Sequence, residues 1–161
     1  MSDTLPYTAR RASRDLFVPL RGLAYRLHCW GGPDLVRPDR PALLLCHGYM
    51  DVGASFQFLV DALAALEGES RFVVALDWRG YGDTRVPATD HYWFPDYLAD
   101  LDALLDGRVA GLDARTQPID LLGHSMGGNV VMHYAGVRPT RIRRLVNLEG
   151  FGLPASTPDE A

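Results

Sequence analysis

The hydrophobic positions of this chain form short apolar runs that alternate with longer helical patterns. Two runs, residues 16–20 and 23–30, flank Arg21-Gly22 and predict an antiparallel β-hairpin. Later runs are almost wholly apolar, as in strands that are covered on both faces of a parallel sheet. These buried strands are predicted over residues 42–46, 72–76 and 118–122, and a last short strand over residues 145–148.

Apolar residues spaced by three or four positions predict amphipathic helices between these strands. The first helix begins near Ser55, a candidate N-cap, and ends at Gly68, a candidate C-cap. The second covers residues 96–106. Its apolar face is regular, so Asp100 and Asp102 are expected to face water.

The third predicted helix covers residues 126–137 and ends before Pro139, because proline cannot continue a helix. After the hairpin, strands and helices therefore alternate. This order predicts the α/β class, with a mostly parallel sheet and helices on both of its faces. Residues 1–14 lack periodicity and are expected to be a flexible leader, residues 15–152 form the predicted domain, and residues 153–161 form a tail.

Ser125 has the most informative surroundings in the chain. It lies in Gly123-His124-Ser125-Met126-Gly127-Gly128, where a predicted strand runs into a predicted helix. A Gly-x-Ser-x-Gly sequence at such a junction is typical of a nucleophile elbow. The turn is so sharp that the positions flanking the serine need glycine, and the first amides of the helix can stabilise an oxyanion. A nucleotide-binding loop is not favoured, because no lysine follows the glycines.

Two further loops are expected beside Ser125. His47-Gly48-Tyr49 follows the strand over residues 42–46, and residues 77–83 follow the strand over residues 72–76. The carboxyl ends of parallel strands meet at one edge of a sheet, and open α/β sheets carry their ligand sites at that edge. The three loops are therefore expected to converge on one site.

With these motifs placed, the chain resembles the α/β-hydrolase superfamily over residues 16–152. The resemblance rests on residues 46–49, 77–82 and 123–128, which occur in the order and spacing of that family. It implies the hydrolase fold, and for the whole protein it implies a serine hydrolase that acts on a carboxylic ester or a similar small-molecule acyl compound. It implies no cofactor, and the spacing of Cys29 and Cys46 does not favour a metal site. The serine also argues against the reactions of dehalogenase and epoxide-hydrolase members, which use an aspartate nucleophile.

The same resemblance implies roles for individual residues. Ser125 is expected to be the nucleophile, and the backbone amides of Tyr49 and Met126 are expected to form the oxyanion hole. Glu149 follows the last predicted strand, where some members of the superfamily place an alternative acid, and it is therefore a candidate for that role. Its alternative interpretation is a solvated loop carboxylate.

The chain departs from the family pattern because it lacks a suitable histidine to act as the general base. The family order is serine, acid, histidine, and His133 is the one histidine after Ser125. Two helical turns place His133 about 12 Å along the axis from the serine, too far to accept its proton. His124 leaves the backbone in another direction. We therefore expect a truncated α/β-hydrolase fold, the N-terminal portion of a hydrolase, with weak or absent turnover by this chain alone.

An alternative hypothesis is a non-catalytic hydrolase remnant or an assembly piece. The strand over residues 145–148 is expected to be an exposed edge, and exposed edges recruit partners. The partner is expected to be a second copy of the chain or a complementing fragment.

The remaining polar candidates are assigned to structural roles. His47 is expected to brace the oxyanion loop, and His28 and His91 are expected at the surface or at a boundary. Asp77 and Asp83 are expected to accept backbone hydrogen bonds within their loop. Two interpretations stay open for the aromatic residues near this edge, which either line an acyl pocket or pack beneath loops. They are Trp78, Tyr81, Tyr92, Trp93 and Phe94.

Composition and charge narrow the classes of partner. The 161 residues include 20 acidic and 16 basic side chains, a formal net charge of −4, so a nucleic-acid partner is not expected. The longest apolar runs are far shorter than the roughly 20 residues of a membrane span, and the N-terminus is polar, so a cytoplasmic protein without a membrane partner is expected. Cys29 and Cys46 lie inside predicted strands and are expected to be buried and free.

Overall fold

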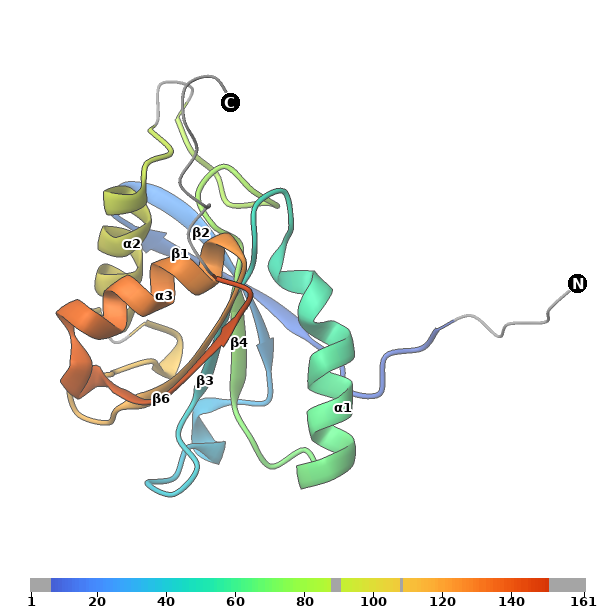
Figure 1. Ribbon diagram of the computed structural model, residues 1–161. Helices are drawn as coiled ribbons and strands as arrows, with labels where there is room; N and C mark the ends of the chain where they lie inside the picture. Colours follow the sequence, from blue (N-terminus) through green and yellow to red (C-terminus); the bar gives the residue numbers. More distant parts are fainter. Residues whose placement is uncertain (1–6, 88–90, 108, 151–161) are drawn as a thin grey trace, which may run out of the picture.

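A computed structural model of the chain describes residues 7–87, 91–107 and 109–150. Its centre is a six-stranded sheet with the strand order β1-β2-β4-β3-β5-β6 (Figure 1). The strands are β1 (Arg14–Leu20), β2 (Leu23–Trp30), β3 (Leu43–Cys46), β4 (Val73–Leu76), β5 (Ile119–His124) and β6 (Ile142–Leu148). The α/β class predicted from the alternation is confirmed.

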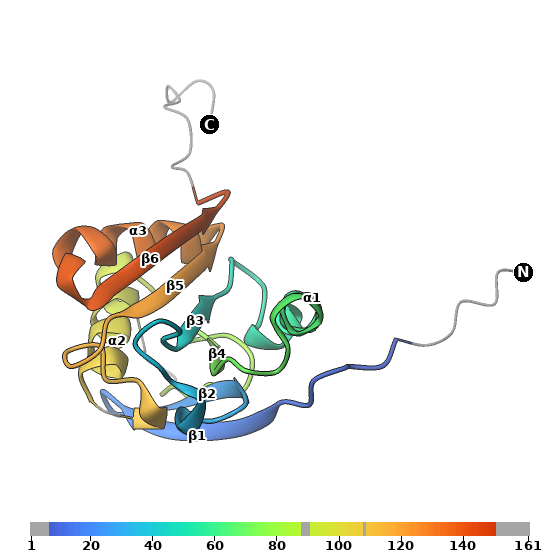
Figure 2. The same ribbon diagram turned by 90° about the horizontal axis from the view of Figure 1, so that it is seen from below.

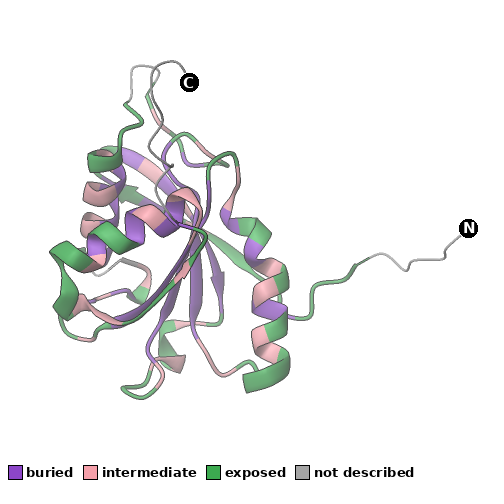
Figure 3. Ribbon diagram, in the orientation of Figure 1, coloured by how far each residue is buried: buried purple, intermediate pink, exposed green. Residues whose placement is uncertain are grey.

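The sheet has an antiparallel part and a parallel part. β1 and β2 form the predicted hairpin, and β2 also pairs antiparallel with β4. The pairs β4–β3, β3–β5 and β5–β6 are parallel. β3 and β4 are buried along their whole length, as their continuous apolar sequences predict (Figure 3).

Helices cover both faces of the sheet, as expected (Figure 2). α1 (Gln57–Glu67) lies on one face, and α2 (Phe94–Asp106) and α3 (Met126–Val137) lie together on the other. Val60 of α1 packs with one apolar cluster, and Leu101 of α2 and Val130 of α3 pack with the larger one. Short 3₁₀ turns η1 to η4 cover Pro33–Leu35, Gly53–Phe56, Val109–Gly111 and Pro139–Arg141.

The start of α1 differs from the prediction. Ser55 lies inside the 3₁₀ turn that precedes the helix, and its hydroxyl donates to the carbonyl oxygen of Val52 at 2.8 Å. α1 begins at Gln57, and its N-cap Phe56 makes no side-chain capping bond. The predicted C-cap, Gly68, is confirmed with φ 70°. Ser55 therefore stabilises the turn and not the helix end.

The expectation that Asp100 faces water is wrong. Asp100 is 1% exposed. Its carboxylate accepts hydrogen bonds from Arg79 Nε at 2.6 Å and from Arg79 Nη2 at 2.8 Å. The Tyr25 hydroxyl also donates to Asp100, at 2.6 Å. Helical periodicity gives the angle of a side chain around the axis, but it does not reveal that an arginine from a distant loop folds beneath the helix. Asp102 is half-exposed.

Part of the segment predicted as a leader is held against α1. Asp61 accepts hydrogen bonds from the Tyr7 hydroxyl and from the backbone amides of Arg10 and Arg11, at 2.9 and 3.0 Å for the two amides. Gln57 Nε2 donates to the carbonyl oxygen of Arg11 at 2.9 Å. These bonds fix residues 7–11 on the helix, whereas the predicted tail, residues 153–161, lies outside the described residues.

No helix in the described ranges is long and apolar enough to cross a lipid bilayer. Cys29 and Cys46 are both buried and free. Burial raises the pKa of each thiol above its ordinary value, which disfavours the reactive thiolate.

Candidate active site

Ser125 lies at the junction of β5 and α3 in an unusual backbone conformation. Its φ of 51° and ψ of −118° place a non-glycine residue where L-amino acids are rarely found. The amide of Ser125 donates to the carbonyl oxygen of Leu148 at 2.8 Å, and the amide of Asn129 donates to the carbonyl oxygen of Ser125 at 3.0 Å. The serine is therefore held on a sharp turn that connects β5 to α3, and its carbonyl oxygen accepts the first hydrogen bond of that helix.

Close backbone contacts explain the glycines around this turn. A Cβ atom at Gly123 would lie 2.4 Å from the carbonyl oxygen of Gly127. A Cβ atom at Gly127 would lie 2.3 Å from the carbonyl oxygen of Cys46, and one at Gly128 would lie 2.4 Å from Asn147 Oδ1. Real Cβ atoms do not approach other atoms so closely, so α3 begins in contact with β3 and β6 only because these positions lack side chains.

The loop after β3 lies directly against Ser125. A Cβ atom at Gly48 would be 3.1 Å from Ser125 Cβ, so the chain of Gly48 and Tyr49 passes beside the serine. Met126 is the first residue of α3, and the amides of a first helical turn have no partner within the helix. The structure thus places the predicted nucleophile and both predicted amide donors, Tyr49 and Met126, at one edge of the sheet.

His47 is fixed by its hydrogen bonds. The backbone amide of Trp78 donates to His47 Nε2 at 2.9 Å, and His47 Nδ1 lies 2.7 Å from the carbonyl oxygen of Gly48. Nε2 therefore accepts, and Nδ1 carries the proton. Burial lowers the pKa of His47 below its ordinary value. This imidazole is neutral, with both nitrogens in use, which supports the predicted bracing role and not a role as general base.

Asp77 ties the loop after β4 to the loop after β3. Its buried carboxylate accepts from the amide of Gly53 at 2.7 Å through Oδ1 and from the amide of Asp83 at 3.2 Å through Oδ2. Burial raises the pKa of Asp77, but hydrogen bonds from His28, Gly53 and Asp83 lower it more, so the net pKa lies below the ordinary value. Asp77 accepts backbone hydrogen bonds as predicted, whereas Asp83 is exposed and forms an ion pair with Arg26.

The expectation that His28 lies at the surface or at a boundary is wrong. The residue is 3% exposed, and its ring lies between the carboxylates of Asp15 and Asp77. The alternation of β2 places residue 28 on the face of the sheet that the 3₁₀ turn at Gly53 covers, and a Cβ atom at Gly53 would lie 2.8 Å from His28 Cδ2. The sequence of the hairpin could not reveal that His28 is buried, because the turn that covers it follows β3 and not β2.

The other histidines offer Ser125 no hydrogen-bond partner. His133 Nδ1 lies 2.7 Å from the carbonyl oxygen of Asn129, and its exposed ring faces Phe94 with centroids 6.3 Å apart. His91 is exposed. Within the described ranges no hydrogen bond joins the Ser125 hydroxyl to an imidazole.

Glu149 lies at the end of the turn that supports the elbow. It is exposed and has a φ of 56°. The preceding residue, Leu148, accepts the hydrogen bond of the Ser125 amide, and the amide of the next residue, Gly150, donates to Asn147 Oδ1 at 2.8 Å. Glu149 therefore directly follows Leu148, the residue that is hydrogen-bonded to Ser125. Its role as an acid stays a prediction.

The aromatic residues divide between the two interpretations. Trp78 is fully buried and packs edge-on against Tyr97 at 5.4 Å, so it lies beneath the loops. Tyr92 is 53% exposed and Trp93 68% exposed. Tyr49, also 68% exposed, packs edge-on against Tyr81 with centroids 6.1 Å apart. The exposed aromatic rings therefore belong to the loops that follow β3 and β4.

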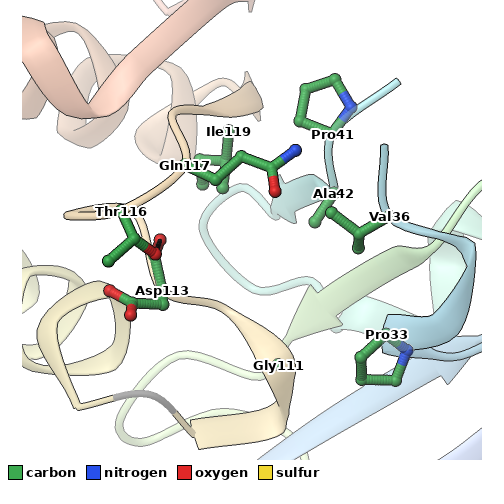
Figure 4. A pocket seen from close by; sticks show the side chains of 9 residues that line it. All are labelled: Pro33, Val36, Pro41, Ala42, Gly111, Asp113, Thr116, Gln117 and Ile119. Carbon is green, nitrogen blue, oxygen red and sulfur yellow. Dashed lines mark hydrogen bonds between the residues drawn. The ribbon is translucent and has the colours of Figure 1, made fainter. Parts of the chain in front are cut away.

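The cavity in Figure 4 lies elsewhere. It encloses about 290 Å³ and is lined by residues at the start of β3 and β5, including Ala42 and Ile119. Ser125 follows the opposite end of β5. Within the described part of the chain, no three His, Cys, Asp or Glu side chains are grouped as metal ligands.

Comparisons with known proteins agree with the α/β fold. Residues 41–161 match the model of the alpha/beta hydrolase fold family. A serine hydrolase-like protein of Danio rerio is 31% identical over 154 residues, which are 94% of this chain and 43% of the relative. Epoxide hydrolase 3 of Siraitia grosvenorii is 32% identical over 115 residues, 71% of this chain and 34% of the relative.

A comparison with solved structures finds the same fold. The thioesterase domain from the curacin biosynthetic pathway superposes with a TM-score of 0.74 at 30% identity, covering 91% of this chain and 47% of that domain. The chain thus spans less than half the length of these similar proteins.

Proposed function

Because the chain belongs to the alpha/beta hydrolase fold family, we propose that it carries the nucleophile of a serine hydrolase that acts on a carboxylic ester or a related acyl compound. One observation carries the proposal. Ser125 has a φ of 51° at the junction of β5 and α3, with Gly48 in contact beside it. A strained serine at the carboxyl end of a central parallel strand, next to two loops that bear amides, fits acyl transfer.

The proposed reaction follows from this placement. Ser125 Oγ loses its proton and attacks the carbonyl carbon, and the carbonyl oxygen becomes an oxyanion that accepts hydrogen bonds from the amides of Tyr49 and Met126. The intermediate then expels the alcohol, which takes up a proton, and leaves an acyl group on Ser125. Attack by water releases the carboxylic acid and restores the hydroxyl.

Within the described residues no hydrogen bond joins the Ser125 hydroxyl to an imidazole, so we propose that solvent takes the serine proton when this chain acts alone. We therefore propose weak or absent turnover by the isolated chain. Loss of the base removes most of the rate of a serine hydrolase, while an oxyanion hole retains a small part.

A fluorophosphonate probe tests both statements, because it phosphonylates activated serines. We expect slow labelling of the wild-type chain at Ser125, none in Ser125→Ala, and wild-type behaviour in Ser70→Ala, a distant serine between α1 and β4. The rate should rise with hydroxide concentration without a plateau near pH 7, since no imidazole titrates. Equal labelling of Ser125→Ala would overturn the assignment, and rapid labelling with a plateau would show that a base is present.

The surroundings of Ser125 favour an apolar acyl group. Tyr49, Met50, Tyr92 and Trp93 are all more than half exposed at this edge, and apolar walls with few polar groups are typical of small-molecule sites. Epoxide hydrolases are among the similar proteins. A serine in the nucleophile position instead favours acyl chemistry, since the resemblance implies aspartate for epoxide opening.

One observation favours a second candidate, an assembly role. β6 is one of the two outer strands of the described sheet, and its Leu145, Val146 and Leu148 are 39, 43 and 42% exposed. We propose that this edge pairs with a second copy of the chain or with a separate fragment that supplies a further strand. Sedimentation at increasing concentration should reveal dimers that Val146→Lys weakens. A stable monomer at high concentration that gains no activity from an added fragment would contradict this candidate.

A further inference from the structure

Asn147, near the end of β6, closes the turn that supports the serine elbow. Its Oδ1 accepts a hydrogen bond from the amide of Gly150 at 2.8 Å, and its Nδ2 donates to the carbonyl oxygen of Gly150 at 3.1 Å. Nδ2 also contacts the sulfur of Met132 on α3. The side-chain amide thus binds both backbone groups of the residue three positions further along the chain.

This turn lies directly against the first turn of α3. A Cβ atom at Gly128 would lie 2.4 Å from Asn147 Oδ1 and 2.7 Å from the Cα atom of Gly150. A Cβ atom at Gly150 would lie 2.5 Å from the Cα atom of Gly128. No side chain therefore separates the two backbones, and the contact is two residues from Met126, whose amide is a proposed oxyanion donor.

The same turn carries the acceptor for the nucleophile's own backbone. The carbonyl oxygen of Leu148 accepts from the amide of Ser125 at 2.8 Å. The next residue, Glu149, has a φ of 56°, a conformation that L-amino acids rarely adopt and that persists only where neighbouring contacts fix it. The two bonds between Asn147 and Gly150 span this residue.

We infer that Asn147 is a positioning residue for the proposed nucleophile. Its side-chain amide holds residues 147–150 in the conformation that presents the Leu148 carbonyl oxygen to the Ser125 amide. The contact with Gly128 places the same turn against the start of α3. The effect on the reaction rests on the proposed function, whereas the effect on the Ser125 backbone does not.

The two bonds to Gly150 explain why this position carries a carboxamide. Asparagine offers an acceptor oxygen and a donor nitrogen, whereas an ionised carboxylate only accepts. Asn147→Asp would keep the bond from the Gly150 amide and lose the bond to the Gly150 carbonyl oxygen. Asn147→Ala would lose both, so the two variants grade the loss.

Hydrogen exchange of the Ser125 amide, followed by NMR, tests the positioning role. We expect exchange about tenfold faster in Asn147→Ala, as for the loss of one hydrogen bond, and an intermediate rate in Asn147→Asp. The amide of Leu44 in central β3 should keep its rate, and Arg144→Gln, a change at an exposed residue of β6, should alter neither amide. An unchanged Ser125 rate would overturn the inference, and so would equal acceleration at Leu44, which indicates a general loss of stability.

Fluorophosphonate labelling tests the effect on the reaction. We expect Ser125 to be labelled several-fold more slowly in Asn147→Ala than in the wild type, with the wild-type rate in Arg144→Gln. Equal labelling rates despite faster amide exchange would overturn the link to the site. A wild-type chain that is not labelled at Ser125 would instead contradict the proposed function, and the exchange rates would still decide the role of Asn147. If Asn147→Ala does not fold, Asn147→Asp, which keeps one bond, serves for both measurements.

Discussion

The backbone amide of Ser125 donates a 2.8 Å hydrogen bond to the carbonyl oxygen of Leu148, so the end of β6 holds the serine turn directly. On the other side of the turn, Gly127 lies against the carbonyl oxygen of Cys46 at the end of β3. The ends of strands on both sides of β5 therefore fix the conformation of Ser125. Strain at this residue persists because its neighbours determine it from two directions.

The first prediction concerns Gly127. Gly127→Ala should lower the free energy of unfolding by about 1–3 kcal/mol, since its Cβ would lie 2.3 Å from the backbone oxygen of Cys46. Gly136→Ala is the matched control on α3. Nothing lies within 4 Å of its Cβ position, so this change should raise the stability by about 0.5–1 kcal/mol. Urea unfolding measures both, and similar effects of the two variants would contradict the close contact.

The second prediction compares two aspartates on α2. Asp100→Ala removes the buried carboxylate that accepts from Arg79 Nε and Nη2 and should cost about 3–5 kcal/mol. Asp102, two residues away, pairs with Arg138 and Arg141 at a half-exposed position. Asp102→Ala should cost at most about 1 kcal/mol. Equal losses in urea unfolding would show that the burial of Asp100 is not decisive.

The third prediction concerns the N-terminal segment. Hydrogen bonds from the Tyr7 hydroxyl, and next from the amides of Arg10 and Arg11, lower the pKa of Asp61 to about 2. Since the folded pKa lies below the ordinary value of 3.8, the docking is complete above that pH and is lost as the pH falls toward about 2. At neutral pH, Asp61→Asn should speed tryptic cleavage after Arg10 and Arg11, and Glu67→Gln on the same helix should not. Unchanged cleavage of Asp61→Asn would contradict the docking.

The fourth prediction concerns His47. Burial lowers its pKa below the ordinary value of 6.5, so the folded state binds this proton less readily than the unfolded state. The stability that His47 contributes is then complete above about pH 6.5 and declines as the pH falls toward the lowered pKa. The difference in unfolding free energy between the wild type and His47→Gln should therefore shrink from pH 7.5 to pH 5. A difference that is independent of pH would contradict the neutral imidazole.

The serine turn was predictable because its constraints are local. Gly123, Ser125 and Gly127 lie within five positions, and the apolar strand before them and the helical pattern after them both fix the geometry. The predicted bounds of α3, residues 126–137, agree with the structure for the same reason. Family resemblance added the roles of these residues, which the fold alone does not assign.

Contacts between distant segments were not predictable. The burial of His28 depends on a 3₁₀ turn at Gly53, and that of Asp100 depends on Arg79, which comes from another loop. Hydrophobic periodicity predicts which face of a helix or strand packs on the core. It does not predict which distant loop covers the other face. The exposure of His28 and Asp100 was therefore predicted wrongly, because both are covered by segments distant in the sequence.

A crystal structure of the Ser125 phosphonate adduct, prepared by long incubation with a fluorophosphonate, tests the central claim most directly. The account predicts a covalent bond from Ser125 Oγ to phosphorus, with the phosphonyl oxygen about 2.7–3.1 Å from the amide nitrogens of both Tyr49 and Met126. A phosphonyl oxygen that contacts neither amide, or an adduct that forms on a residue other than Ser125, would contradict it.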